Sequence, residues 1–175
     1  MGKDTHYGPL KREFSAGGVV FKRSKGKILF LITKSSPSER IPEAVWRLPK
    51  GWIDNKGEEL PGEVASGQRR GSEEEIQKAA LREVEEEGGG RAKILEKLGT
   101  VKLFFSLKGE KILKFVTFYL MGWLEDLPQG PGKETELTKW LRFEEAYKKL
   151  KYGSEKEVLS KASKTLERGI QENLV

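Results

Sequence analysis

The stretch Gln77–Gly90, QKAALREVEEEGGG, constrains the fold most, because its pattern fits one helix that gathers carboxylates on a single face. With about 100° of rotation per residue, Glu83, Glu86 and Glu87 fall within roughly 100° of one another, on an arc shared with apolar side chains. Burying such charges requires a cation or hydrogen bonds. The spacing therefore predicts a divalent metal site of hard oxygen ligands or, alternatively, a solvated acidic helix face.

Composition restricts the class of protein. The chain has 175 residues and no cysteine, so we expect one domain over residues 1–175, without disulfides or thiolate metal sites. No apolar run approaches the ~20 residues of a membrane-spanning helix, and the polar lead-in 1–11, expected to be flexible, does not resemble a signal peptide. We therefore expect a cytoplasmic protein without a membrane partner. The formal net charge of +6 suits anionic ligands such as nucleotides, unless these charges only solvate the surface.

The order of the predicted elements favours an α/β fold. Apolar and β-branched runs predict a hairpin of strands at Glu13–Phe21 and Lys27–Thr33, then a short strand at Val45–Leu48. A polar, glycine-rich loop over 54–71, expected to be mobile, precedes a helix that Ser72 or Gly71 would cap and three glycines would end. Further strands are predicted at 92–99, 100–106, 112–123 and 136–142, and further helices at 143–150 and 154–170. This order predicts a three-layer α/β/α sandwich with a central mixed sheet.

Several segments resemble the Nudix hydrolase family, whose box reads G-x5-E-x7-R-E-U-x-E-E-x-G-U, where U is a bulky aliphatic residue. Glu74 is followed by seven residues and then by REVEEEGG over 82–89, which fits the second half of the box without a gap. LPKG over 48–51, AGGVVF over 16–21 and the W-L-x-x-E-E-A pattern over 140–146 also resemble family members. The resemblance spans residues 13–170 and implies the Nudix-type α/β/α sandwich.

Two departures from the family pattern affect the predicted site. In this chain 22 residues separate Gly51 from Glu74 where the family has five, an insertion of 17 that coincides with the polar loop over 54–71. The pair Gly57-Glu58 also resembles the Gly-Glu pair of the family, which would place the extra residues after it. Gly90 stands where the box ends on an aliphatic residue, and Ile94 could fill that packing position instead.

The resemblance implies a Mg²⁺ site, for which Mn²⁺ could substitute. The metal ligands implied in this sequence are Glu83, Glu86, Glu87, the carbonyl of Gly51 and, from outside the box, Glu134. Glu136 and Glu110 are weaker candidates for the outside position. In the family, metals bind the substrate phosphates and activate a water molecule that attacks phosphorus.

The remaining roles concern the proton and the phosphates. The predicted catalytic residues are Glu83, Arg82 and Glu86, with Glu83 as a further metal ligand or the general base and Arg82 orienting the carboxylates. Lys50 and Arg47 are predicted to contact substrate phosphates, although an outward strand position is an equally good interpretation of Arg47. As a hypothesis, the inserted loop closes over a polyphosphate, so that deletion of residues 60–70 would raise KM while the fold survives.

The implied activity is hydrolysis of a nucleoside diphosphate linked to another group, with a diadenosine polyphosphate or related nucleotide as the leading substrate. The alternatives are (deoxy)nucleoside triphosphates, ADP-ribose or nucleotide sugars, diphosphoinositol phosphates and RNA 5′ ends. Nucleic acid would be a partner only as an RNA 5′-end substrate. A non-catalytic module that binds nucleotide or RNA is a different class of function, and the complete carboxylate set argues against it. Both a monomer and a homodimer fit the sequence.

Overall fold

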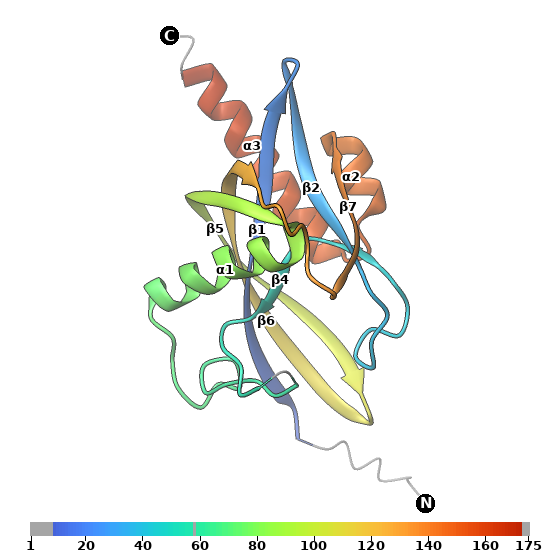
Figure 1. The fold of residues 1–175 in the computed structure, drawn as a ribbon. Helices are drawn as coiled ribbons and strands as arrows, with labels where there is room; N and C mark the ends of the chain where they lie inside the picture. The colour runs from blue at the N-terminus through green and yellow to red at the C-terminus, as the bar shows by residue number, and fades with distance from the viewer. Residues whose placement is uncertain (1–8, 58, 173–175) are drawn as a thin grey trace, which may run out of the picture.

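The computed structural model describes residues 9–57 and 59–172, and it forms a sheet with helices on both faces (Figure 1). Glu58, the alternative glutamate of the Gly-Glu pair, lies outside the described residues. So do residues 1–8 of the predicted lead-in. Lys11, at the end of that lead-in, already belongs to the first strand. In chain order the elements are β1 Lys11–Ser24, β2 Lys27–Ser35, β3 Trp46–Arg47, β4 Lys50–Trp52, α1 Glu73–Gly88, β5 Gly90–Leu107, β6 Glu110–Asp126, β7 Thr135–Leu141, α2 Phe143–Lys149 and α3 Gly153–Glu172.

The sheet is mixed, as predicted, because its central strand β1 has neighbours of both directions. The strand order is β3-β2-β1-β6-β5, with β4 also paired to β1 and β7 also paired to β2. β1 runs antiparallel to β2 and β4 but parallel to β6. The turn between β1 and β2 places Lys25 and Gly26 at φ 50° and 75°, the left-handed conformations that a tight hairpin turn requires. The predicted hairpin is thereby confirmed.

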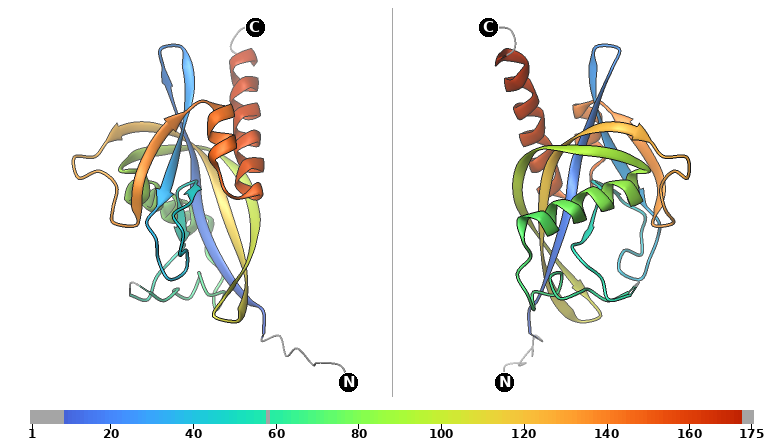
Figure 2. Two further views of the ribbon diagram at one scale, coloured as in Figure 1. Left: turned by 90° about the vertical axis from the view of Figure 1, so that its right-hand side faces the viewer. Right: turned by 60° about the vertical axis from the view of Figure 1, so that its left-hand side comes forward.

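The helices form two layers, one on each side of the sheet (Figure 2). α1 covers one face, where Ala79, Ala80 and Val84 pack in one apolar core with the sheet. α2 and α3 cover the other face, with a second core that includes Ala146 and Leu159. The two cores follow from the alternation of side chains along β1 and β6, which sends successive residues to opposite faces. The predicted α/β/α sandwich is therefore confirmed.

Two strand predictions differ from the structure. The runs 92–99 and 100–106 belong to one long strand, β5, which pairs with β6 across register shifts near Arg91, Ile94 and Lys97. Such irregularities add a local bend and twist to a strand without ending it. The strand predicted at Val45–Leu48 is only Trp46–Arg47.

The glycine in place of the last box aliphatic has a packing reason. A Cβ added at Gly90 would lie 2.0 Å from the Trp123 ring, so the indole already fills the space that a larger residue would need. Ile94 also packs at the edge of this core. The Trp123 ring therefore fills most of the packing space that Ile94 was predicted to fill.

The loop over 54–71 is fastened to the core rather than loose. The Asp54 carboxylate accepts hydrogen bonds from the backbone N–H groups of Val64 and Ala65, at 3.1 and 2.7 Å. The carbonyl of Ala65 in turn accepts from the Phe14 N–H at 2.8 Å. The side chains of Val64 and Ala65 are 3% and 0% exposed and belong to the core under α1. Deleting residues 60–70 would remove core side chains, so the structure contradicts the expectation that the fold survives this deletion.

None of the helices among residues 9–57 and 59–172 is long and apolar enough to cross a membrane. The prediction of one domain over residues 1–175 stays a prediction.

Candidate active site

α1 carries the predicted carboxylates, and both of its ends are capped. Ser72 accepts a hydrogen bond from the Glu75 N–H while the Glu75 side chain accepts from the Ser72 N–H, a capping box. At the other end Gly89 takes φ 77° and its N–H donates to the Glu85 carbonyl. The predicted helix start and stop are therefore confirmed. Between these caps the rotation of the helix is set by its apolar side, which faces the sheet.

Glu83 is buried, with 5% of its surface exposed. The Arg82 guanidinium donates to Glu83 Oε1 at 2.9 Å. Burial and then the neighbouring charge of Glu87 raise the pKa of Glu83 to about 7, against the opposing effect of Arg82. A Cβ added at Gly51 would lie 2.3 Å from this carboxylate, so only glycine allows the approach of β4 to α1. Glu83 and the backbone of Gly51 thus meet, as the predicted metal site requires.

Glu87 lies deeper in the same cluster, with 3% exposed. It accepts from the Arg47 guanidinium at 2.7 Å through Oε1 and from the Lys50 backbone N–H at 3.1 Å through Oε2. Burial raises the pKa of Glu87, and the charges of Arg47 and Lys50 oppose that effect. The protein therefore compensates the charged forms of both inward carboxylates only in part.

Glu86 does not share the inward face, and here the angular prediction is wrong. Its side chain is 58% exposed, and its nearest cation is Arg82, whose Nε lies 3.7 Å from Glu86 Oε1. The residue sits at the rim of the buried arc, beside a groove of about 560 Å³ between α1 and the loop before β7. Arg82, Glu86 and Gly132 line this groove. Glu86 therefore faces the side from which a ligand could approach.

Arg82 joins the helix to the end of β4. Besides Glu83, its guanidinium donates to the carbonyls of Trp52 at 2.7 Å and Ile53 at 3.3 Å. Three acceptors fix the side chain, which supports the predicted orienting role of Arg82.

The candidates outside the box lie in different places. Glu134 is exposed in the loop before β7, and its negative charge contributes to the raised pKa of Glu87, so the two carboxylates are near one another. Glu136 faces Lys34 at 3.6 Å. Glu110 pairs with Lys11 at 2.7 Å, away from α1 at the tip of the β5–β6 hairpin, because Lys11 and Ile112 are in register. Glu134 is thus the candidate that the geometry favours, and Glu110 is excluded.

The structure places Lys50 away from the predicted phosphate site. Lys50 pairs in register with Gly17, and its side chain reaches α3, where its ammonium lies 3.1 Å from the Glu155 carboxylate. Both side chains are buried, at 4% and 0% exposed. The prediction that Lys50 contacts substrate phosphates is therefore wrong, because its ammonium is buried against Glu155. Arg47 points inward to Glu87 with 12% exposed, so the outward interpretation was wrong.

Sequence reasoning missed Lys114 and Arg40, a cation that acts on it. Burial lowers the pKa of Lys114 to about 8, and the charges of Lys50, Arg47 and Arg40 add to this effect while Glu13 opposes it. Lys114 forms no ion pair with any of the described residues. Arg40 bonds Glu13 through both carboxylate oxygens at 2.8 Å and lies over the Trp52 ring. The only sequence signal for Lys114 was a lysine in an otherwise apolar strand.

The donor set fits a hard divalent cation. Among residues 9–57 and 59–172, no three acidic, histidine or cysteine side chains already converge closely enough to hold an ion. The carboxylates of Glu83 and Glu87 are nevertheless buried and raised in pKa, and both lie against the segment 50–51, Glu83 beside Gly51 and Glu87 at the Lys50 N–H. Oxygen ligands with uncompensated negative charge are those that Mg²⁺ prefers.

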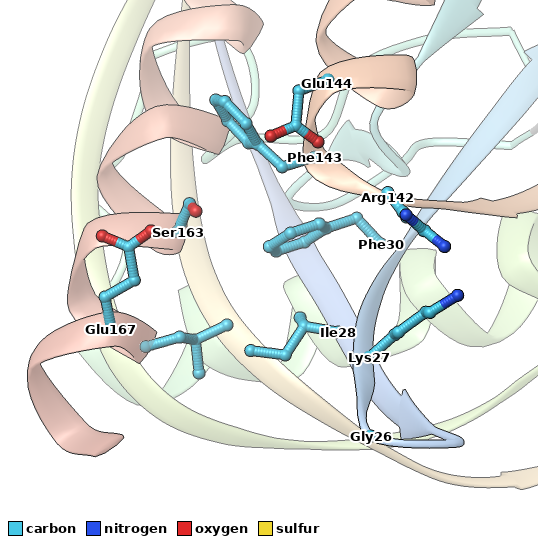
Figure 3. A pocket seen from close by; sticks show the side chains of 10 residues that line it. Gly26, Lys27, Ile28, Phe30, Arg142, Phe143, Glu144, Ser163 and Glu167 are labelled. Atoms are coloured by element: carbon cyan, nitrogen blue, oxygen red, sulfur yellow. The ribbon is translucent and has the colours of Figure 1, made fainter. Parts of the chain in front are cut away.

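A second hollow, of about 310 Å³, lies between the β1–β2 turn, the start of α2 and α3 (Figure 3). Phe30, Ile28 and Phe143 form apolar walls, and Lys27 and Arg142 lie together on one side. It contains none of the predicted site residues.

Known proteins resemble this chain over most of its length. A family model described as the NUDIX domain matches residues 11–162. The protein MutT4 of Mycobacterium tuberculosis (strain CDC 1551 / Oshkosh) is 28% identical over 160 residues, which cover 89% of this chain and 56% of MutT4. The chain therefore spans about half the length of that curated relative.

Solved structures share the fold. A binary complex of a C. elegans Ap4A hydrolase is 26% identical, with a TM-score of 0.61, and the match covers 88% of this chain and 97% of that chain. The NUDIX domain of Shewanella oneidensis NrtR, complexed with ADP ribose, is 16% identical with a TM-score of 0.60, covering 89% of this chain and 88% of that chain. At that identity the second likeness concerns the fold alone.

Proposed function

This chain belongs to the Nudix family, and we propose that it is a Mg²⁺-dependent pyrophosphohydrolase that cleaves a phosphoanhydride bond in a nucleoside diphosphate-linked substrate. The observation that carries this proposal is that two buried carboxylates raised in pKa hold neighbouring residues of β4, since Glu83 lies against Gly51 and Glu87 accepts from the Lys50 N–H. A protein that only bound a nucleotide would gain nothing from holding two acids in this costly arrangement.

The proposed metal ligands are Glu86, Glu87, Glu134 and the Gly51 carbonyl, with Mn²⁺ as a substitute for Mg²⁺. A bound divalent cation supplies an activated water and stabilises negative charge at phosphorus. Of these donors Glu86 lies exposed at the rim of the groove along α1, and Glu134 is exposed in the loop before β7, so a ligand that arrives from solvent can reach both.

The remaining groups orient the carboxylates and accept the proton of the attacking water. The Arg82 guanidinium donates to Glu83 and keeps this carboxylate beside β4. The Arg47 guanidinium donates to Glu87 and fixes the place of that carboxylate. Glu83 would either join the ligands or accept the proton of the attacking water at a carboxylate oxygen. Without a metal its pKa is raised to about 7, and a divalent cation beside it would lower the pKa and favour the ionised carboxylate that a general base requires.

We propose a diadenosine polyphosphate or related nucleotide as the substrate. The 26% identity to a C. elegans Ap4A hydrolase supports this choice. The cytoplasmic location stays a prediction from the sequence.

The test is a hydrolysis panel with Mg²⁺ that contains diadenosine tetraphosphate, nucleoside triphosphates, ADP-ribose and 5′-triphosphorylated RNA. We expect the diadenosine compound to give the highest kcat/KM. Glu86→Gln should lower kcat at least ~10²-fold, the scale of losing one electrostatic contact in a transition state. Glu74→Gln, at a position of α1 that is 77% exposed, is the matched control for the loss of one charge.

Three results would count against the proposal. Absence of turnover on the whole panel would leave a nucleotide-binding module as the better account. Full activity in Glu86→Gln would overturn the metal assignment, and a preference for another member of the panel would replace the proposed substrate.

A further inference from the structure

Glu155 lies in the layer opposite α1 and yet bonds to the segment that carries Gly51. It belongs to the first turn of α3 and is 0% exposed. One carboxylate oxygen accepts from the Leu48 N–H at 2.6 Å, and the other accepts from Lys50 Nζ at 3.1 Å. Leu48 and Lys50 are themselves 0% and 5% exposed, so both bonds are shut off from water. Interactions between charged groups act strongly at such a place.

The same short segment is held from its other side by α1. The backbone N–H of Lys50 donates to Glu87 Oε2 at 3.1 Å. The next residue, Gly51, lies against the Glu83 carboxylate, where an added Cβ would come within 2.3 Å. Residues 48–51 are therefore fastened between an acid of α3 and an acid of α1. A shift on the Glu155 side must move the backbone that Glu83 and Glu87 contact.

We propose that Glu155 is a positioning residue of the active site, which sets the place of the Gly51 carbonyl and of Glu87 by holding Leu48 and Lys50. This inference rests on the proposed function. Glu155 acts through the segment 48–51 and does not touch the substrate. Its two oxygens have separate tasks, because the Leu48 N–H needs only an acceptor whereas the Lys50 ammonium needs a negative charge.

The charge of Lys50 gives the proposal a specific consequence. Glu87 is the other carboxylate whose charge acts on Lys50. Without the charge of Glu155, Glu87 is the carboxylate left to balance the buried ammonium of Lys50, and the positive charge of Lys50 then opposes the binding of a metal cation at Glu87. Replacing Lys50 by methionine removes this competitor while keeping the backbone N–H that Glu87 accepts from.

The test measures Mn²⁺ binding by electron paramagnetic resonance, together with kcat, KM and the Mg²⁺ concentration for half activation. Glu155→Gln keeps an acceptor for Leu48 and removes the charge, and we expect it to weaken Mn²⁺ binding and to lower kcat, each by about 10-fold or more. KM for the nucleotide should change less than about two-fold, because Glu155 holds metal ligands and no part of the substrate. The double variant Lys50→Met/Glu155→Gln should recover most of the lost Mn²⁺ affinity.

A purely structural role gives a different result. Glu155→Gln would then melt at a lower temperature but bind Mn²⁺ and turn over substrate like the wild type, which would overturn the inference alone. A double variant no better than Glu155→Gln would also overturn it, because the competing ammonium would not be the cause. A wild type that neither binds Mn²⁺ nor hydrolyses any nucleotide would fail the proposed function and the inference together. The test does not use Glu155→Ala, which would leave the Leu48 N–H without an acceptor and could prevent folding.

Discussion

The raised pKa of Glu83 makes the stability of the metal-free protein depend on pH in a definite direction. The pKa is about 7 in the folded protein against 4.5 for an unperturbed glutamate. The folded state therefore binds this proton more tightly than the unfolded chain does. The stabilisation from Glu83 is fully present below pH 4.5 and is lost as the pH rises through 7. A difference of about 2.5 pH units corresponds to about 3 kcal/mol.

The perturbation that isolates this effect is Glu83→Gln, which keeps an acceptor for Arg82 and cannot ionise. In EDTA, the free energy of urea unfolding of the wild type should fall between pH 5 and pH 8 by up to about 3 kcal/mol more than that of Glu83→Gln. The variant should therefore be the more stable protein at pH 8. Tryptophan fluorescence follows the transition, because four tryptophans are present.

A matched control separates burial from charge. Glu74→Gln removes the same charge from an exposed position of α1 and should follow the pH dependence of the wild type. Equal pH dependence in the wild type and Glu83→Gln would refute the reasoning, since the buried carboxylate would then cost nothing to ionise. The addition of Mg²⁺ at pH 8 should stabilise the wild type and leave Glu83→Gln less affected.

Three further substitutions test the contacts around the site. Gly51→Ala should lower kcat by about 10-fold or more, because its methyl group would displace the Glu83 carboxylate 2.3 Å away; steady-state kinetics checks this, and unchanged kcat would contradict it. Gly90→Val should lower the unfolding free energy by about 1–3 kcal/mol through overpacking against the Trp123 ring, and Trp123→Ala in the same chain should relieve part of the strain. Asp54→Ala should cost about 1–3 kcal/mol in urea unfolding by leaving two backbone N–H groups unpaired, and cleavage of the 54–71 loop by a protease should become faster.

The parts of the site that follow from neighbours in the sequence were predictable. Ser72 and Glu75 cap α1 three residues apart, and Gly89 ends it, so the helix could be placed from local chemistry. The helical period then put Glu83 and Glu87 on the buried side. The helical period gives the direction in which each side chain points. It does not show how far the buried surface extends around the helix, and Glu86 lies outside that surface.

The parts that depend on distant residues were not predictable. Lys50 and Glu155 are 105 positions apart in the chain, and no local pattern marks a glutamate in the first turn of α3 as the partner of a buried lysine. The polar composition of the inserted loop likewise gave no sign that Val64 and Ala65 are buried in the core. Both results depend on which face of the sheet a strand or loop residue meets, and that follows from the register between strands rather than from composition.

The most direct test of the account is the rate of diadenosine tetraphosphate hydrolysis by one preparation of the wild type, measured first in EDTA and then after Mg²⁺ is added in excess. We expect no detectable turnover in EDTA and full turnover once Mg²⁺ is present, with the same dependence on metal for every substrate of the panel that is cleaved. Hydrolysis that continues in EDTA would contradict the account, because the buried carboxylates of α1 would then have no metal to hold. So would a protein that stays inactive toward the whole panel after Mg²⁺ is supplied.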